Sequence, residues 1–479
     1  MSKKTIDSLR NKYNGKKVLV VGLGLQGGGV GIAKFFAELG AKVTVTDKKT
    51  EEKLLQSINR LKHSSIEFHL GGHDINDFLK ADVIFKGPSV LWNTPEIVAA
   101  QKKNIPIEME MAFVVANYPG KVIGITGTRG KSTTTHLIYN LLKESGFKVS
   151  LGGGLPGIST IECLKDADKD SWLVAELSSW ALSGFHQKKI SPHIAVFTNF
   201  YPDHLNYYKN LEDYFYDKTA IFQYQKERDY LVANQNLQDK VDSALQSFIT
   251  RESLPKGPLS KVKKIVRASS AFIFSKSDFP YQLTYLKGDH NLENAAAALK
   301  VSEILKIDQT KAVEILKNFG GLPYRQQIIG KKNNVTFIND TTSTTPIATI
   351  KALDSFKDQK IILFLGGNSK NLPSVKLINR LYSVEKIILL AGSFTDEILP
   401  VLKKHYLVKL VGPYNNLEQA VEEGYRIAQA LDSRLHGNDK QKQSDEIILL
   451  FSPGATSFAM FNNEFHRGDE FNKIIKKIL

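Results

Sequence analysis

The sequence has one cysteine and no long apolar run, and these two shortages exclude several classes of protein. Cys163 alone cannot form an internal disulfide or a cysteine-rich metal site. No apolar run approaches the roughly 20 residues that a membrane-spanning helix needs, and the polar stretch 1–14 lacks the apolar segment of a secretory signal. We therefore expect a cytoplasmic protein without a membrane span.

Acidic residues are also fewer than basic ones, and 49 Asp and Glu against 64 Lys and Arg give a formal charge of +15. Such an excess can indicate nucleic-acid binding. Here the basic residues are spread along the chain, and no dense basic run is interleaved with aromatic residues, so we expect no nucleic-acid partner. A positive field also suits small anionic substrates such as nucleotides.

The length of 479 residues is too great for one hydrophobic core and predicts about three domains. Three segments each show apolar, strand-like runs that alternate with helical patterns, which is typical of an α/β fold. Turn signals at Tyr118-Pro119-Gly120 and Gly320-Gly321-Leu322-Pro323 separate them. The polar stretches 252–270 and 432–445 are interpreted as surface loops or local disorder. The predicted domains are 1–117, 118–321 and 322–479.

The strongest local signal is Gly127-Thr128-Arg129-Gly130-Lys131-Ser132-Thr133, which lies between a predicted strand and a predicted helix. Small residues let backbone N–H groups turn toward phosphate oxygens, and the helix N-terminus adds a positive dipole. Lys131 can reach the β- and γ-phosphates, and Ser132 or Thr133 can bind Mg²⁺. Ile125 stands where the usual spacing has glycine, so this is a shortened phosphate loop. The alternative is a plain tight turn.

A second glycine motif, Gly22-Leu23-Gly24-Leu25-Gln26-Gly27, follows the first predicted strand, and Asp47 ends the next one. The spacing meets the dinucleotide fingerprint. Alone the motif is weak, because it can bind NAD, bind another nucleotide or simply pack a helix close to a sheet. An NAD-dependent oxidoreductase would leave the loop at Gly127 without a role, so we favour it least.

Two polar residues follow other apolar strands. Glu176 ends the strand Trp172–Leu177, and His204 lies just beyond Ile194–Thr198. Ligands of open α/β sheets gather at the C-terminal ends of the strands, so both side chains are expected near the nucleotide, where a carboxylate and an imidazole could hold Mg²⁺. A lone histidine after a strand is more often structural, and spacing alone leaves both interpretations open.

In chain order, these motifs resemble the Mur ligase family, and its MurD branch most closely. The likeness runs from about Lys17 to Phe471. It also rests on Ala175-Glu176-Leu177-Ser178-Ser179, Asn199 with Asp203-His204-Leu205, Asp289-His290-Asn291, Gly321-Leu322-Pro323-Tyr324-Arg325, Asn339-Asp340-Thr341, Leu365-Gly366-Gly367 with Lys370, and Ser452-Pro453-Gly454-Ala455-Thr456-Ser457-Phe458.

The resemblance implies three domains: a Rossmann-like N-terminal domain, a central phosphate-loop ATPase domain and a Rossmann-like C-terminal domain. It implies an ATP-dependent enzyme, with two Mg²⁺ ions, that ligates glutamate to UDP-N-acetylmuramoyl-L-alanine in peptidoglycan precursor synthesis. The substrate carboxylate would attack the γ-phosphate of ATP and give an acyl phosphate and ADP, and the amine of glutamate would then attack the acyl carbonyl and displace phosphate. A bare carboxylate is a poor acyl donor, so phosphorylation supplies the leaving group and catalysis rests on positioning and charge neutralisation. A monomer is expected.

The resemblance also assigns residues to roles. The first glycine loop would hold UDP rather than NAD, with Gly24, Leu25, Gln26, Gly27, Asp47 and Ser89. ATP would contact the loop Gly127–Thr133, Asn291, Asn294, Arg325 and Asp340. Lys218 matches the lysine that is carbamylated in the family, and an ordinary surface lysine is the alternative. The metal ligands would be Ser132, Thr133, Glu176, His204 and carbamylated Lys218. The catalytic residues would be Lys131, Glu176, His204 and Lys218. Glutamate would contact Thr344, Lys370, Ser457 and Phe458.

Some positions depart from the family pattern. Arg129 stands where the phosphate loop usually has Asn, Gly154 and Ala181 where an Asn and a Gln help to hold substrate, and Glu464 where a Phe often lines the glutamate pocket. The phosphate lysine, the candidate metal ligands and Asp340 are retained, so activity is expected. The amino acid is less certain, and L-glutamate or another amino acid is the near alternative. A non-catalytic nucleotide-binding regulator with the same fold is the distant one.

Overall fold

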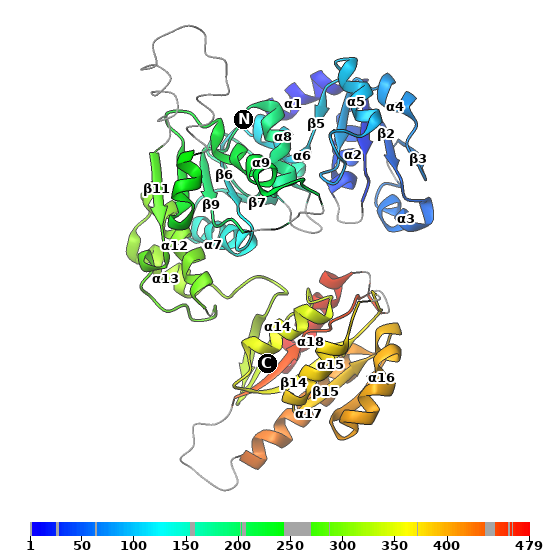
Figure 1. Ribbon diagram of the computed structural model, residues 1–479, viewed down its shortest axis with the longest axis vertical. Coiled ribbons are helices and arrows are strands. Elements are labelled where there is room, and N and C mark those ends of the chain that lie inside the picture. Colours follow the sequence, from blue (N-terminus) through cyan, green and yellow to red (C-terminus); the bar gives the residue numbers. More distant parts are fainter. Residues whose placement is uncertain are drawn as a thin grey trace. The chain divides into compact units, whose positions relative to one another are not determined.

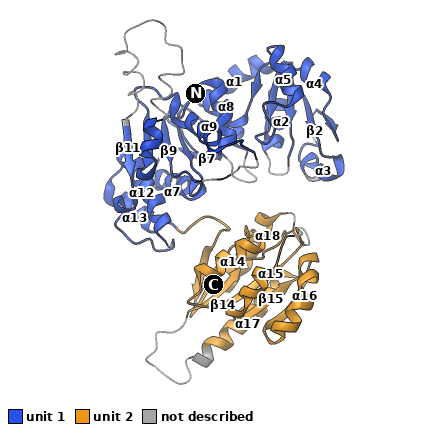
Figure 2. Cartoon of the chain, viewed as in Figure 1, with its two compact units in different colours: residues 1–319 blue, residues 320–479 orange. Residues whose placement is uncertain are grey.

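The computed structural model forms two compact units, residues 1–319 and 320–479 (Figure 2). The predicted α/β class is confirmed, because three largely parallel sheets alternate with helices along the chain (Figure 1). The finer three-domain limits stay a prediction. The described residues are 2–24, 28–62, 65–153, 159–201, 203, 207–243, 270–286, 288–370, 372–435, 446–457, 460–461 and 463–479.

The first unit begins with a five-stranded parallel sheet in the order β3-β2-β1-β4-β5. In β1 the apolar run Val18–Val21 is buried throughout, as expected for a parallel strand covered on both faces. The strands are β1 Lys17–Val21, β2 Lys42–Asp47, β3 Ile66–Leu70, β4 Val83–Lys86 and β5 Ile107–Glu108, and the helices α1 Ser2–Tyr13, α2 Gly28–Glu38, α3 Glu51–Asn59, α4 Ile75–Lys80, α5 Pro95–Lys102 and α6 Glu110–Asn117.

The same unit continues with a six-stranded parallel sheet in the order β11-β10-β9-β6-β8-β7. Because β6 lies between β8 and β9, the C-terminal ends of these three strands are neighbours. The strands are β6 Lys121–Thr126, β7 Val149–Gly153, β8 Trp172–Glu176, β9 Ile194–Phe197, β10 Tyr230–Asn234 and β11 Ser270–Phe274.

The helices of this second sheet include α7 and α12, which pack against each other. α12 carries four consecutive buried alanines, Ala295–Ala298, which allow it to lie close to α7. The elements are α7 Lys131–Glu144, η1 Thr160–Lys165, α8 Ser179–Lys188, α9 Leu211–Gln223, η2 Gln235–Leu237, η3 Lys276–Asp278, α12 Asp289–Ile304 and α13 Gln309–Lys317.

The second unit holds a six-stranded sheet in the order β12-β13-β17-β14-β15-β16, in which only the pair β12–β13 is antiparallel. Helices cover both faces (Figure 1). The strands are β12 Gln327–Lys332, β13 Val335–Asn339, β14 Lys360–Gly366, β15 Lys386–Leu390, β16 Leu410–Tyr414 and β17 Ile447–Phe451, and the helices α14 Pro346–Ser355, α15 Val375–Arg380, η4 Leu381–Ser383, α16 Ser393–Tyr406, η5 Leu407–Lys409, α17 Leu417–Leu435 and α18 Glu464–Ile478.

The two polar stretches differ in part from their interpretation as loops. Ser270 begins β11, and residues 432–435 belong to the last turn of α17, so both elements reach further than the sequence pattern indicated. The rest of both stretches lies outside the described residues. Among the helices that the structure describes, none combines the length and the apolar character needed to cross a membrane.

Candidate functional site

The phosphate loop connects β6 to α7, as the sequence predicted. Gly127 and Gly130 have φ values of 147° and 80°, which favour glycine. A Cβ atom on Gly130 would also lie 2.4 Å from Asn294 Oδ1, so no larger residue fits there without movement. The loop ends where α7 begins at Lys131, and the positive end of the helix dipole therefore faces the loop.

The end of β9 holds the phosphate loop in place. Asn199 accepts hydrogen bonds from the backbone N–H of Thr128 (3.0 Å) and, through Oδ1, from that of Arg129 (2.8 Å). Thr198 Oγ1 donates to the carbonyl of Arg129 at 2.7 Å. The Arg129 side chain forms an ion pair with Asp203 at 2.6 Å. Sequence reasoning gave Thr198 no role, although a hydroxyl at the end of a buried strand beside a glycine loop is a usable signal.

Ser132 and Glu176 form the described part of the predicted magnesium site. Ser132 Oγ donates to Glu176 Oε2 at 2.7 Å, so the start of α7 and the end of β8 meet. A hydroxyl and a carboxylate are hard oxygen ligands of the kind that Mg²⁺ prefers, and the pair fits the ion. Thr133 is half-buried in the same helical turn. His204 lies outside the described residues, so its place beside Glu176 stays a prediction.

Lys218 is buried in α9, with 1% of its surface exposed, and the interpretation as a surface lysine is wrong. Its Nζ donates to the carbonyl of Gly127 at 2.9 Å, and Lys131 Nζ donates to the same oxygen at 3.2 Å. Burial, and then the charge of Lys131, lower the pKa of Lys218 to about 7. Roughly half of these amines are neutral at neutral pH, and a neutral amine can react with CO₂.

The first two turns of α12 bring the two predicted asparagines to the phosphate loop. Asn294 is buried, and its Oδ1 accepts a hydrogen bond from Thr134 Oγ1 at 3.1 Å. Its Nδ2 donates to Asn291 Oδ1 at 3.2 Å. Asn291 therefore lies at the entrance of α12, next to the turn of α7 that follows the loop.

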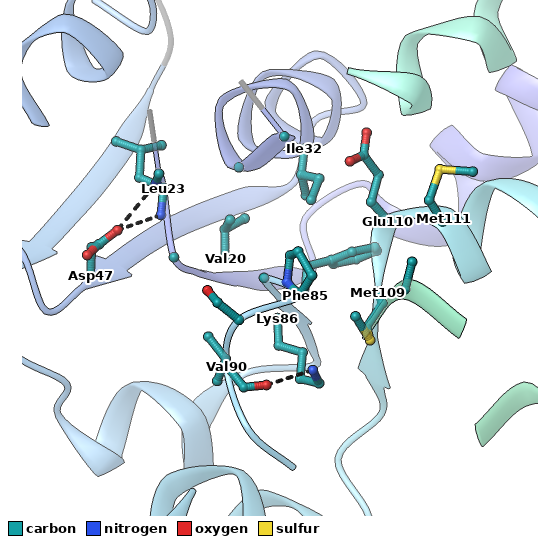
Figure 3. A pocket seen from close by; sticks show the side chains of 18 of the residues that line it. Val20, Leu23, Ile32, Asp47, Phe85, Lys86, Val90, Met109, Glu110 and Met111 are labelled. Atoms are coloured by element: carbon teal, nitrogen blue, oxygen red, sulfur yellow. Dashed lines mark hydrogen bonds between the residues drawn. The ribbon is translucent and has the colours of Figure 1, made fainter. Parts of the chain in front are cut away.

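A pocket of about 750 Å³ extends from the first glycine loop to Glu176. Gly24, Asp47 and Ser89, three residues predicted to hold UDP, line it. Figure 3 shows that Asp47 points toward the loop, where its Oδ2 accepts from the backbone N–H of Leu23 (2.9 Å). The carboxylate therefore stabilises the loop, a role that spacing alone did not reveal. Leu25, Gln26 and Gly27 lie outside the described residues.

The same pocket contains two charged residues that sequence reasoning missed. Lys86 is buried; its Nζ donates to the carbonyl of Val90 at 2.8 Å and lies 4.4 Å above the ring of Trp92. Burial lowers the pKa of Lys86 to about 8. Glu110 Oε1 accepts from Ser159 Oγ at 2.9 Å, and burial raises the pKa of Glu110. A lysine that ends the apolar strand β4 could have been recognised as unusual.

The second unit carries the predicted residues Asp340 and Arg325. Asp340 is 1% exposed; its Oδ1 accepts from the backbone N–H of Gln326 (3.0 Å) and its Oδ2 from Ser452 Oγ (2.7 Å). Burial raises the pKa of Asp340 to about 6. Arg325 is exposed and directly precedes Gln326, whose backbone N–H bonds Asp340.

The predicted glutamate-binding residues lie in the same unit. Lys370 Nζ donates to Thr344 Oγ1 at 2.9 Å, which brings these two residues together. Ser457 is 2% exposed, and its Oγ has no hydrogen-bond partner among the described residues. A buried hydroxyl without a partner is unfavourable and is expected where a ligand completes the site. Phe458 lies outside the described residues.

Comparisons with known proteins agree with this arrangement. Residues 125–302 match the Mur ligase middle domain, and residues 16–108 match the N-terminal domain of MurD-like Mur ligases. The UDP-N-acetylmuramoylalanine–D-glutamate ligase of Borreliella afzelii is 34% identical over 470 residues, 95% of this chain and 97% of that protein. The enzyme of the same name from Acetivibrio thermocellus is 32% identical over 490 residues, 99% of each chain.

A solved structure supports the fold. The UDP-N-acetylmuramate–alanine ligase MurC from Thermotoga maritima has a TM-score of 0.50 at 19% identity and covers 97% of this chain and 100% of its own. The fold and the site define an α/β protein of three sheets, in which a glycine loop between β6 and α7 has the form of a phosphate loop. The chain belongs to the Mur ligase family, in its MurD branch, and the resemblance seen in the sequence is confirmed.

Proposed function

We propose that the protein is an ATP-dependent ligase that joins D-glutamate to UDP-N-acetylmuramoyl-L-alanine through an acyl phosphate, a step of peptidoglycan precursor synthesis. The observation that carries the proposal is that Gly24 and Glu176 line the same pocket. A substrate whose UDP group lies at the glycine loop of the first sheet would present its other end to the phosphate loop. The enzymes of this name in two bacteria share about a third of their residues with the chain over nearly its whole length.

The residues around the phosphate loop suit phosphoryl transfer to a carboxylate. Backbone N–H groups from Gly127 to Thr133 and the ammonium group of Lys131 would bind the phosphates of ATP. Mg²⁺, when bound, would neutralise charge on the triphosphate, and Ser132 and Glu176, with His204, would hold it. We also propose that Lys218 reacts with CO₂, because its burial keeps part of the amine neutral. The carbamate would then be a further oxygen ligand, and a second Mg²⁺ is part of the proposal.

The amino-acid site is proposed for the second unit, at Thr344, Lys370, Ser457 and Phe458. Lys370 supplies a cation, and Ser457 supplies a hydroxyl that no other described residue bonds; together they suit a carboxylate of glutamate. The choice of D-glutamate rests on the names of the relatives, and L-glutamate is the alternative to be tested. Arg325 and Asp340 remain proposed contacts of the nucleotide. We propose a cytoplasmic monomer that acts on small molecules and not on nucleic acid.

The test is the release of phosphate from ATP by the purified full chain. Release is expected only when Mg²⁺, UDP-N-acetylmuramoyl-L-alanine and D-glutamate are all present, and L-glutamate should not replace D-glutamate. The product should carry one added glutamate by mass spectrometry. Phosphate release that is independent of both substrates would refute the proposal, and a preference for L-glutamate would correct its stereochemistry.

A pair of variants on one helix tests whether turnover depends on the lysine of the phosphate loop. Lys131→Ala should abolish turnover, because the triphosphate loses its ammonium contact. Lys143→Ala is the control, since Lys143 is exposed in the last turn of the same helix, α7, far along the helix from the loop. The ligase proposal requires that only the first variant be inactive. Equal effects of both variants would contradict the role given to the loop.

A further inference from the structure

A fully buried arginine lies in the second unit at a position to which no role has been given. Arg467, in α18, is 1% exposed. Its Nε donates to Thr341 Oγ1 at 2.9 Å, its Nη2 to the carbonyl of Thr341 at 2.8 Å and its Nη1 to the carbonyl of Ala455 at 3.2 Å. The guanidinium group also lies 6.0 Å from the centre of the Phe451 ring. Its planar fork thus bonds two separate chain segments at once.

The two segments that Arg467 joins are those with the predicted site residues. Thr341 directly follows Asp340, and Ala455 lies two residues before Ser457. α18 has little room to shift here, because a Cβ on the next residue, Gly468, would lie 2.6 Å from Thr341 Cγ2. The guanidinium group therefore fixes the distance between the end of β13 and the loop that carries Ser457.

The acceptors of Arg467 are all neutral. Among the described residues, no carboxylate forms an ion pair with it, and Glu464, one turn earlier on α18, acts on it only through its charge. Burying a cation without a hydrogen-bonded anion is strongly unfavourable. Nearby in the chain, the buried Ser457 hydroxyl has no partner in the part of the chain that the structure describes. An anion bound near these two groups would stabilise the guanidinium charge and could accept a hydrogen bond from the hydroxyl.

We propose that Arg467 is a positioning residue for the amino-acid substrate: it holds the Ser457 loop against the Thr341 segment, and its charge makes the site select an amino acid with a side-chain carboxylate. This inference rests on the proposed function, because it assumes that an amino acid binds at Ser457. Asp340 is held separately, by Gln326 and Ser452, so nucleotide binding should not depend on Arg467 in the same way.

Three variants of the full-length enzyme test the inference. Arg467→Met removes both the charge and the guanidinium hydrogen bonds, whereas Arg467→Lys keeps the charge but not the planar guanidinium group. The matched control is Arg426→Met, which removes an exposed arginine of α17 that pairs with Glu423. The KM values for D-glutamate, ATP and the UDP-linked substrate are measured together with kcat. The rate with D-glutamine, which lacks the side-chain carboxylate, is measured beside them.

We expect Arg467→Met to raise the KM for D-glutamate at least tenfold, while the other two KM values change less than twofold. Its preference for D-glutamate over D-glutamine should fall at least tenfold as well. Arg467→Lys should raise the KM for D-glutamate less and keep most of the preference, which a purely structural role would not predict. Arg426→Met should match the wild-type enzyme.

Other results would overturn the inference. They are an unchanged KM for D-glutamate in both Arg467 variants, a parallel rise of all three KM values, or failure of both variants to unfold cooperatively, which would make Arg467 a structural residue only. A wild-type enzyme that does not use D-glutamate would refute the proposed function itself, and thus the two failures are distinguishable.

Discussion

Replacing Lys218 by methionine tests whether burial lowers the pKa of the Lys218 amine and thereby reduces the stability of the folded protein. The amine has an ordinary pKa of 10.5 and a pKa of about 7 in the folded chain, chiefly because it is buried. At about 1.4 kcal/mol per pKa unit, this difference corresponds to roughly 5 kcal/mol. That free energy opposes folding wherever the amine must be protonated in the folded state, that is, below about pH 7. Methionine fills a similar volume without the charge, and the Gly127 carbonyl keeps its bond from Lys131.

The sign of the pH dependence follows from proton counting. Between pH 7 and 10.5 the unfolded chain holds a proton on Lys218 and the folded chain does not, so the wild-type protein gains stability as the pH rises. Lys218→Met lacks this gain. The variant should therefore be more stable than the wild type at pH 7, by a few kcal/mol, and should lose this advantage by about 1.4 kcal/mol per pH unit above it.

The measurement is urea unfolding of both proteins at pH 7, 8 and 9, in buffer free of CO₂ and divalent metal so that neither carbamylation nor metal binding interferes. Lys209→Met, which removes an exposed lysine shortly before α9, is the control for loss of a surface charge. A stability difference between Lys218→Met and the wild type that does not change from pH 7 to 9 would refute the argument that burial displaces the proton.

Three further predictions concern the same sites. Gly130→Ala should weaken ATP binding measured by calorimetry, by about 1–2 kcal/mol from its positive φ alone, with more from the approach to Asn294; unchanged affinity would contradict the loop geometry. Glu176→Gln retains an acceptor for Ser132 but loses the charge, so Mg²⁺-dependent turnover should fall at least ~100-fold while the melting temperature stays close to that of the wild type; near-normal turnover would exclude Glu176 as a metal ligand. Ser457→Ala removes a hydroxyl without a partner among the described residues, so stability should not fall, whereas the KM for D-glutamate should rise about tenfold; the reverse pattern would indicate a structural role.

The sequence allowed the layering and the phosphate loop to be predicted because both depend on local patterns. One continuous stretch of chain contains a buried apolar strand, two glycines, a lysine and the start of a helix. Because these residues are close in sequence, they are also close in the folded protein. The position of Glu176 was also predictable, since parallel strands bring their C-terminal ends to one edge of the sheet.

The remaining features depend on contacts between residues distant in the chain. The family resemblance assigned Asp47 to the UDP group, and the structure adds that its carboxylate bonds the backbone of the glycine loop. Lys86 is buried and Glu110 half-buried in the pocket because β4 and α6 pack beside other elements, and no local pattern encodes that packing. The role proposed for Arg467 depends on its three acceptors, which lie on two segments distant from it in the chain.

Lys131 and Lys218 are best understood as one unit, although they lie 87 positions apart (218 − 131). Both ammonium groups reach the carbonyl of Gly127, so the charge of Lys131 disfavours a second charge on Lys218. A cation in the phosphate loop thus helps to keep the buried amine neutral, and only the neutral amine reacts with CO₂. A carbamate would replace a second positive charge by a negative one beside Glu176, which would turn a site that attracts phosphate into one that also attracts Mg²⁺. Under the proposed function, Lys131 would therefore bind the nucleotide and also favour carbamylation of Lys218.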